Sequence, residues 1–530
     1  MIIKILKSLL SIINLVIINK FENNFINHNK LIFDKPNNKD NKILVEMVGS
    51  QANHIAVSYL SGILAKNYNA QIMGYNVRIP INIFQKIKLN ITNYKKKKIF
   101  ESFGMTEILK FNVNKNFKNQ AKKLGNELMS KIRSKSDLEA LIVDDIWVGD
   151  LIYDQYLRFN LVPTLDIHSV KFKKVMFEFC FIYLYWRKIL LEKNVKALVV
   201  SHACYFTGLS ARIANEFDIP AYQATLENIY YLTKDNPHPS SEFHSYKKDF
   251  EKLDIETKKR GIKKARERLE LIFEGSVNVD QRYIKNSAYH KKKSDERILQ
   301  NKSPIKVLIS PHCFFDSPHG IGKILFPDFY EWLDFICKVS TKTDYEWYIK
   351  THPKTFLENK IVVKDFVSRY PNIQYLSDEV SHNQLINEGI NIVLTVYGSI
   401  GLEYAARNKT VINASMNNPH ISFDFNIHPK SKEDLKTIIL NLDKYVKAEL
   451  FSEDVYKCYY MKYLNYNNDI FIKDFKTEIN KMGGYYNSLF TPKIYDFWIK
   501  YWSRYIHSQI NNSLKEFVLS GEYKMKSIWN

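Results

Sequence analysis

Short apolar runs alternate with amphipathic stretches in two regions of the chain, most regularly between residues 304 and 447. Each apolar run there ends at polar residues, as a buried strand does, and is followed by apolar residues spaced three and four apart, which predicts a helix. The predicted strands are 305–310, 345–353, 372–376, 391–398 and 409–415, and the predicted helices are 327–340, 356–369, 381–389, 399–408 and 431–447. Alternating strands and helices predict a parallel sheet with right-handed crossovers, so we expect a Rossmann-like domain over 304–447.

The region 41–275 shows the same alternation less regularly. Its predicted strands are 42–48, 71–75, 138–145, 195–202 and 220–224, and its clearest helices are 55–66 and 208–217. Polar, charged and poorly periodic residues at 276–303 are typical of a linker. The predicted fold class is therefore α/β, with two Rossmann-like doubly wound domains facing a cleft.

The segment 448–530 lacks a strand pattern, and we expect a helical C-terminal tail. Its aromatic residues Tyr495, Trp498, Trp502 and Tyr505 are spaced three, four and three apart and so form one helical stripe. Such a stripe favours packing in the protein core, and a membrane-interface belt is the alternative.

Residues 1–40 read as an amphipathic helix and a lead-in to the first domain. The charge-free run from Ser8 to Asn19 is too short to span a bilayer, which needs about 20 apolar residues. No small-residue cleavage site follows it, so a secretory signal is not expected. The helix could lie peripherally on a membrane or pack against the protein's own core.

Composition restricts the class of partner. Lys and Arg total 77 against 56 Asp and Glu, a formal charge of +21, which favours anionic partners unless it reflects only a general richness in lysine. We find no nucleic-acid-binding motif and expect no nucleic-acid partner. The five cysteines have no metal-ligand spacing and predict neither a disulfide scaffold nor a zinc site, so a reducing, cytoplasmic location is expected.

Candidate chemistry in the second region lies after its strands, because parallel sheets bind ligands at the carboxyl ends of their strands. Three loops carry polar residues there and predict a phosphate-binding site. The residues are Pro311, His312, Asp316, His319, Gly320, Gly322 and Lys323 in the first loop, Lys350, His352 and Lys354 in the second, and Gly398, Ser399, Gly401 and Glu403 in the third. A metal site from His312, Asp316 and His319 is conceivable, but further ligands are missing.

The first region offers candidates for an acceptor-binding surface by the same logic. Gln51 and His54 follow its first strand, and Asp144 follows the apolar residues Leu-Ile-Val within the predicted strand 138–145. A transfer reaction needs a base for the acceptor hydroxyl, and His202 or Asp145 could serve. A separate pair, Asp154 and Arg158, is four residues apart and could form an ion pair on a helix surface.

The stretches KTHPK, TVYGSIGLEYAARNKTVINAS and HCFFDSPHG resemble the donor half of GT-B glycosyltransferases. They are most similar to the capsule and surface polysaccharide biosynthesis proteins, and the resemblance covers about residues 300–440. LIVDDIWVGDLIYDQYLR and VVSHACYFTGLSARIANEFDIPAY also look like that family. The resemblance implies that His352 and Ser399 bind the donor phosphates and that Glu403 binds its ribose. An Asp/Glu-Asp/Glu-Gly base motif is absent, the nearest match being Phe273-Glu274-Gly275.

We therefore expect a cytoplasmic glycosyltransferase that takes a sugar from a nucleotide-sugar and transfers it to a glycan or a lipid-linked acceptor. Preorganised donors around the leaving phosphate would supply the main stabilisation, so no metal or other cofactor is required. A nucleotide-sugar epimerase or a polyol-phosphate transferase on the same fold stays open. A non-catalytic assembly component of polysaccharide synthesis or export stays open too.

Overall fold

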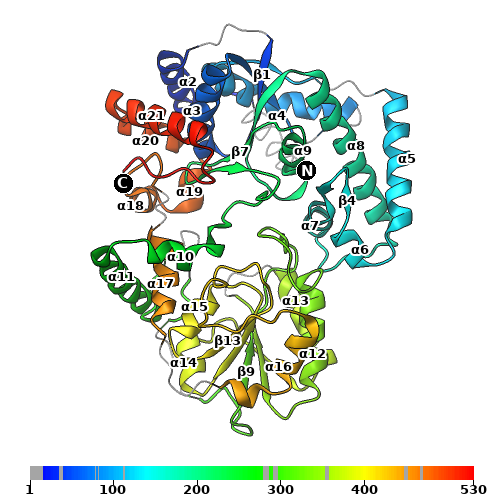
Figure 1. The fold of residues 1–530 in the computed structure, drawn as a ribbon, viewed down its shortest axis with the longest axis vertical. Coiled ribbons are helices and arrows are strands. Elements are labelled where there is room, and N and C mark those ends of the chain that lie inside the picture. The colour runs from blue at the N-terminus through cyan, green and yellow to red at the C-terminus, as the bar shows by residue number, and fades with distance from the viewer. Residues whose placement is uncertain are drawn as a thin grey trace, which may run out of the picture.

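The computed structural model describes residues 16–34, 40–77, 79–80, 83–110, 114–277, 286–290, 296–352, 357–446, 452–465 and 469–529. Two α/β domains lie one above the other (Figure 1). The first contains a six-stranded sheet of order β3-β2-β1-β6-β7-β8. Its strands are β1 Asn41–Glu46, β2 Ala70–Tyr75, β3 Met105–Ile108, β6 Val195–Val200, β7 Ala221–Ala224 and β8 Ile229–Leu232. β7 and β8 pair antiparallel, and the other four pairings are parallel.

Helices cover both faces of this sheet, as the alternation of side chains along β1 requires. Leu44 packs with one face, against α5 to α9, while Ile43 and Val45 pack with the other, against α2, α3 and the end of α4. These helices are α2 Lys20–Ile32, α3 Gln51–Asn67, α4 Ile83–Ser102, α5 Lys115–Lys131, α6 Lys135–Glu139, α7 Gly149–Asn160, α8 Val170–Glu192 and α9 Leu209–Glu216. The doubly wound arrangement predicted for the first domain is confirmed.

The second domain is a parallel five-stranded sheet of order β11-β10-β9-β12-β13. Its strands are β9 Lys306–Ile309, β10 Glu346–Lys350, β11 Ile373–Leu376, β12 Ile392–Thr395 and β13 Thr410–Asn413, and its helices are α12 Phe329–Ser340, α13 Leu357–Arg369, α14 His382–Asn387, α15 Ile400–Ala405 and α16 Lys432–Ile439. Each strand lies inside its predicted range. Ser381 caps α14, its side chain accepting a hydrogen bond from the Asn383 N–H.

The chain crosses between the domains more than once. Helices α10 Tyr246–Glu251 and α11 Ile255–Phe273 pack in one core with the second sheet, so the second domain begins earlier than the predicted boundary at residue 275. Helix α17 Asp454–Tyr460 joins that same core. The remaining tail, α18 Phe475–Lys481, α19 Tyr485–Leu489, α20 Lys493–Tyr501 and α21 Arg504–Ser520, returns to the first domain beside α2 and α3 (Figure 1).

The aromatic stripe of the tail divides along its length. Tyr495 and Trp498 are fully buried, and Tyr495 stacks on Phe25 with ring centroids 4.3 Å apart. Tyr505 is exposed. Tyr495 and Trp498 therefore pack in the protein core, whereas Tyr505 does not.

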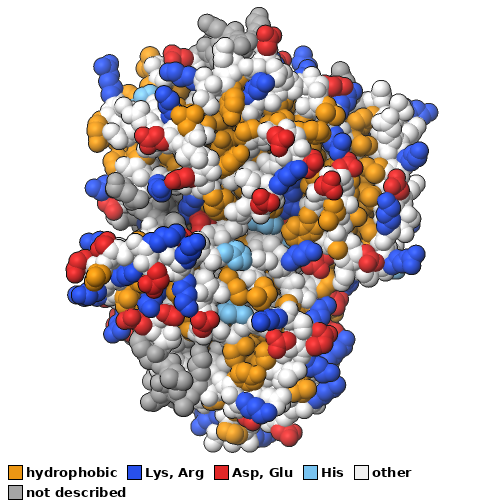
Figure 2. All heavy atoms as spheres, viewed as in Figure 1, with side chains coloured by type: hydrophobic (Ala, Val, Ile, Leu, Met, Phe, Trp, Pro, Cys, Tyr) orange, Lys and Arg blue, Asp and Glu red, His pale blue; other side chains and the backbone are white. Residues whose placement is uncertain are grey.

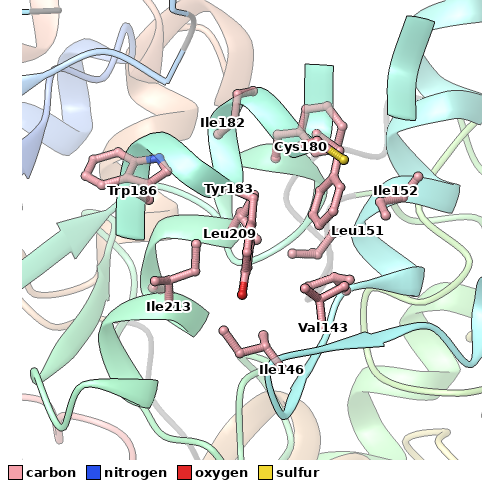
Figure 3. Packing of buried hydrophobic residues seen from close by; sticks show 14 of the residues in the cluster. Val143, Ile146, Leu151, Ile152, Cys180, Ile182, Tyr183, Trp186, Leu209 and Ile213 are labelled. Carbon is pink, nitrogen blue, oxygen red and sulfur yellow. The ribbon is translucent and has the colours of Figure 1, made fainter. Parts of the chain in front are cut away.

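The predicted strand 138–145 is wrong. Its residues form the end of α6 and a separate antiparallel hairpin, β4 Ile142–Val143 with β5 Ile146–Trp147. Asp144 and Asp145 make the turn with positive φ angles of 49° and 63°, as a two-residue hairpin turn of type I′ requires. The apolar residues are there because Val143 and Ile146 pack against Tyr183 of α8 and its neighbours (Figure 3), outside the main sheet.

The predicted N-terminal amphipathic helix falls largely on residues 1–15, which lie outside the described part of the chain. Within the described residues, we find no helix with both the length and the hydropathy needed to cross a bilayer.

Candidate functional site

The strand order of the second sheet reverses direction between β9 and β12, which makes the carboxyl ends of these two strands its switch point. Ligands of open α/β sheets bind in the crevice at such a point. His312 follows β9 by three residues, and Tyr397 and Gly398 follow β12. A Cβ added at Gly398 would lie 3.7 Å from Cε1 of His312, so the two loops meet directly.

The imidazole of His312 is fixed by the residues around it. Its ring stacks on Phe329 and lies against Tyr397, with centroids 4.7 and 4.5 Å away. Its Nε2 accepts a hydrogen bond from the Tyr397 backbone N–H at 3.2 Å. The proton of the neutral ring must therefore be on Nδ1. Burial lowers the pKa of His312 to about 4, so the ring is a neutral N–H donor at physiological pH.

The third predicted loop is engaged by the protein itself. Helix α15 is short, and the Ser399 hydroxyl bonds to Glu403. Oε2 of Glu403 also accepts a hydrogen bond from the Tyr289 hydroxyl at 2.8 Å, while burial raises its pKa. A Cβ at Gly401 would come within 2.5 Å of His420, so this glycine permits close packing. The roles in nucleotide binding predicted for Ser399, Gly401 and Glu403 stay predictions.

The second predicted loop follows β10, which lies beside β9 in the sheet. His352 is exposed there. Lys350 is buried with its Nζ 3.5 Å from Nε2 of His382, and burial lowers its pKa to about 8. Lys354 lies outside the described residues. The strand end before His352 is adjacent to the switch point, which favours a role in phosphate binding. That role stays a prediction.

Much of the first predicted loop binds the other domain instead of facing a ligand. His319 is fully buried, with Nδ1 2.7 Å from Oδ1 of Asp154 and Nε2 3.6 Å from Oε1 of Glu139. Burial opposes its charge, but these carboxylates outweigh burial and raise its pKa to about 10. The donor-binding role predicted for His319 is therefore replaced by an interdomain ion pair. The expected Asp154–Arg158 pair is wrong for the same reason.

Two other residues of this loop also contact the first domain. Nζ of Lys323 lies 5.5 Å from the ring centroid of Trp147, and Oδ1 of Asp316 accepts a hydrogen bond from the Tyr205 hydroxyl at 2.6 Å. His312, Asp316 and His319 thus have separate partners. In the described residues no group of His, Cys, Asp and Glu side chains is arranged to hold a metal ion.

The first sheet has its own switch point between β1 and β6, and a hydrogen-bonded chain of side chains lies there. Oγ of Ser201 donates to Oε1 of Glu46 at 2.9 Å, and the Ser201 N–H donates to Oε2 at 2.6 Å. Oγ of Ser201 is also 2.9 Å from Nδ1 of His202. Burial raises the pKa of Glu46, and Lys96, whose Nζ donates to the Met47 carbonyl at 3.1 Å, partly opposes this.

The hydrogen bonds among these side chains determine the tautomer of His202. The single hydroxyl proton of Ser201 points to Glu46, so the hydroxyl can only accept from His202, and Nδ1 carries the proton. Nε2 is then left with a lone pair. The side chain is exposed to solvent, although partial burial by the surrounding loops lowers its pKa. A neutral, accessible Nε2 is the form that a general base needs.

The other first-domain candidates lie elsewhere. His54 is buried, with Nδ1 2.6 Å from the Tyr495 hydroxyl and Nε2 3.0 Å from the Val48 carbonyl, so it joins the tail to the domain and does not line a surface. Asp144 accepts a hydrogen bond from Tyr183 at 2.6 Å and pairs with Arg187. Asp145 is in the same hairpin turn, not at the end of a sheet strand. Gln51 is the half-buried first residue of α3.

The two switch points are joined across the domain interface. Tyr205 is three residues after His202 and Asp316 is four after His312, so their hydrogen bond brings the two loops together. Histidine side chains also reach the surface along the band where the domains meet (Figure 2). A pocket of about 350 Å³ is lined by Glu270, Phe273, Glu274, His290, Ser381, Asn383, Asn387 and Arg407, none of which is at either switch point.

Sequence reasoning missed Glu46, Ser201 and the interdomain contacts. Glu46 had a readable signal, because it is a charged residue inside the apolar run from Ile43 to Val48. Its pairing with Ser201 connects residues 155 positions apart and is set by the β1–β6 pairing. The contacts of Asp328 with Tyr153 at 2.7 Å and Thr164 at 2.6 Å join residues that are even farther apart in sequence, by 175 and 164 positions.

No protein-family model and no curated protein matches this chain. Among solved structures, it is similar to the KpsC β-Kdo 2,4 transferase of Thermosulfurimonas dismutans, with 13% identity, a TM-score of 0.31, and coverage of 53% of this chain and 86% of that one. A glycosyltransferase of Rickettsia africae has 10% identity, a TM-score of 0.23, and coverage of 92% and 100%. The UDP-GlcNAc 2-epimerase of Neisseria meningitidis, solved with UDP-GlcNAc, has 10% identity, a TM-score of 0.22, and coverage of 80% and 97%.

Proposed function

We propose that the chain is a glycosyltransferase that moves a sugar from a nucleotide-sugar to a hydroxyl of a glycan or lipid-linked acceptor. One observation supports this most: two histidines at joined switch points present opposite hydrogen-bonding groups. His312 has its Nε2 occupied and offers Nδ1–H, whereas His202 has its Nδ1 occupied and offers the Nε2 lone pair. A group-transfer reaction needs a donor for the leaving group and an acceptor for the nucleophile's proton.

In the proposed step, Nε2 of His202 takes the proton of the acceptor hydroxyl. The acceptor oxygen forms a bond to the anomeric carbon while the bond from that carbon to the nucleotide's phosphate oxygen breaks. Nδ1–H of His312 donates to the departing phosphate, where negative charge develops. A neutral donor held rigidly against two aromatic rings needs little reorganisation during the step, which is how preorganised sites lower a barrier.

Glu46 and Ser201 act in this proposal as positioning residues. They hold the Nδ1–H tautomer of His202, and the buried carboxylate favours the imidazolium that forms when the proton is transferred. His352 and Ser399, at neighbouring strand ends, are proposed to add contacts to the donor phosphates. No metal or other cofactor is needed in this scheme.

The test is a screen of the purified chain against CMP-, UDP-, GDP- and CDP-linked sugars and the free nucleotides. Thermal unfolding detects binding, and mass spectrometry follows the donor and any added acceptor glycan. A ligand that binds the native state at a hundredfold excess over its Kd stabilises it by about 2.7 kcal/mol. We expect one nucleotide family to stabilise the protein and to support sugar transfer.

Each other result would overturn part of the proposal. An epimerised donor with no transferred sugar would make the chain an epimerase. Transfer of a polyol phosphate in place of a sugar would make the chain a polyol-phosphate transferase. Absence of stabilisation by every nucleotide would favour a non-catalytic component. A stabilising nucleotide whose effect survives in His312→Ala would place the donor elsewhere.

A further inference from the structure

The first half of α4 exposes a row of large apolar side chains. Phe84, Ile87, Ile91 and Tyr94 are 78%, 51%, 36% and 46% exposed. Their spacing of three, four and three residues places them on one face of the helix. Scattered exposed apolar residues are ordinary on protein surfaces, but a continuous row along a helix marks an interaction site.

This row points away from the domain. At about 100° per residue, Phe84, Ile87, Ile91 and Tyr94 fall within one quarter of the helix circumference. The buried residues Asn93 and Phe100 fall on the opposite side, where α4 packs on the first domain. An ordinary surface helix turns its apolar face inward, as α4 does with Ile99 and Phe100, but the first half of α4 has a second apolar face that is exposed.

The same stretch is strongly cationic. From Ile83 to Lys98 the helix carries six lysines and no acidic residue. At about 100° per residue, exposed Lys88 lies beside the apolar row and exposed Lys98 lies in line with it. Lys95 is bound to Glu22 at 2.9 Å, and Lys97 and Lys98 share one carboxylate, Glu101, at 3.6 and 3.7 Å. An excess of positive charge remains along the exposed face.

The row also lies at the edge of the sheet that carries His202. Helix α4 follows β2 and precedes β3, so it starts at the carboxyl edge of the parallel sheet. Lys96 contacts the Met47 carbonyl, one residue beyond the end of β1, which marks the level of that edge. Residues 84–94 come before Lys96 and therefore extend past the edge by up to about 18 Å, at 1.5 Å per residue.

We propose that this exposed face of α4, residues 84–98, docks on an anionic lipid bilayer. Apolar and aromatic side chains would enter the boundary between headgroups and acyl chains, while the lysines contact acidic headgroups, as in interfacial amphipathic helices. Charge decides against a second copy of the chain, because a symmetric contact would bring two lysine-rich faces together. The proposal does not depend on transferase activity, but it would bring a lipid-linked acceptor to the carboxyl edge where His202 lies.

The test is flotation of the full chain with vesicles of phosphatidylcholine alone and of phosphatidylcholine with one-third phosphatidylglycerol. We expect binding to the anionic vesicles that weakens at high salt, because surface charge is screened. The double variant Phe84→Ser, Ile87→Ser should bind at least roughly tenfold more weakly, since it removes two of the inserted side chains. The matched control Leu191→Ser, Ile361→Ser removes two residues that are 66% and 59% exposed on other helices, and it should bind as the wild type does.

A second pair of variants tests the charges. Lys88→Gln, Lys98→Gln should weaken binding to anionic vesicles, whereas Lys122→Gln, Lys123→Gln on α5 should not. Circular dichroism confirms that each variant is folded. The proposal is overturned if the wild type does not bind anionic vesicles or if Phe84→Ser, Ile87→Ser binds as the wild type does. Self-association that only this double variant abolishes, without vesicle binding, would assign the face to a second copy.

Discussion

The two switch points occupy the same place in two similar sheets, yet they prepare a histidine for opposite tasks. In the first domain a hydrogen-bonded side-chain relay holds Nδ1 of His202 and leaves an exposed lone pair. In the second domain a backbone N–H and two aromatic rings hold Nε2 of His312 and leave an N–H. The role of an imidazole is therefore determined by the partner of its other nitrogen, not by its position in the fold.

Replacement of His202 tests the proposed general base of the first domain and has the largest expected effect. In His202→Ala, kcat should fall by roughly 10²–10⁴-fold, the usual contribution of a general base. The Kd of the nucleotide-sugar should be close to that of the wild type, because the residue faces the acceptor. Rapid-mixing assays and equilibrium dialysis measure the two quantities. A near-normal kcat would remove His202 from the reaction.

Replacement of His319 tests whether the interface joins the two switch points. His319→Gln leaves Asp154 buried without its cationic partner and should lower the free energy of unfolding by about 3–5 kcal/mol. The exposed His168→Gln is the control, and denaturant titration provides the measurement. Equal stability of the two variants would contradict a structural ion pair.

The pH dependence sharpens that test. The pKa of His319 rises from 6.5 to about 10 in the folded chain, so its stabilising charge is fully present below pH 6.5 and is lost as pH rises through about 10. The stability difference between the wild type and His319→Gln should therefore shrink from neutral to alkaline pH. A difference that is constant across this range would mean that packing, not charge, explains the loss.

Replacement of His312 tests the donor half. His312→Ala should weaken nucleotide-sugar binding by roughly 10–150-fold, because a hydrogen bond to a charged group is worth about 1.5–3 kcal/mol. The low pKa of about 4 keeps the ring neutral, so wild-type donor affinity should not change near the ordinary pKa of histidine. An affinity that rises as pH falls through about 6.5 would instead indicate a protonated histidine at the phosphate.

Replacement of Ser201 has the smallest expected effect. Ser201→Ala removes the hydroxyl between Glu46 and His202, and kcat should fall by roughly two- to tenfold, the worth of one hydrogen bond of about 0.5–1.5 kcal/mol. The apparent pKa in the pH–rate profile should shift as well, and Ser201→Thr should restore both. An unchanged pH profile would mean that the relay does not control His202.

The second domain was predictable from sequence because its parallel strands are buried on both faces. Val307, Leu308 and Ile309 form an uninterrupted apolar run, as such strands do. Edge strand β3 was missed because Thr106 and Glu107 are exposed within it. The hairpin at 142–147 gave a false strand because burial against α8 leaves the same apolar signature as burial in a sheet.

The candidate site was predictable only in part. His202 and His312 stand out because each lies two or three residues after the end of an apolar strand. Their tautomers depend on the Ser201 hydroxyl and the Tyr397 N–H, whose directions arise from the folded backbone. The wrong prediction of an Asp154–Arg158 pair has a similar cause. The four-residue spacing is visible in the sequence, whereas the contact of Asp154 with His319 arises only in the fold.

The return of the C-terminal tail also constrains how the protein is made. One core of the first domain combines Phe25 and Ile26 with Phe471, Trp498 and Leu514. This core is therefore complete only after the residues up to Leu514 have been synthesised. A ribosome emits residues in order, and most domains fold as they emerge. Here the first domain must wait with an apolar face open while the second is synthesised. A chain released before residue 471 would leave that face exposed to solvent.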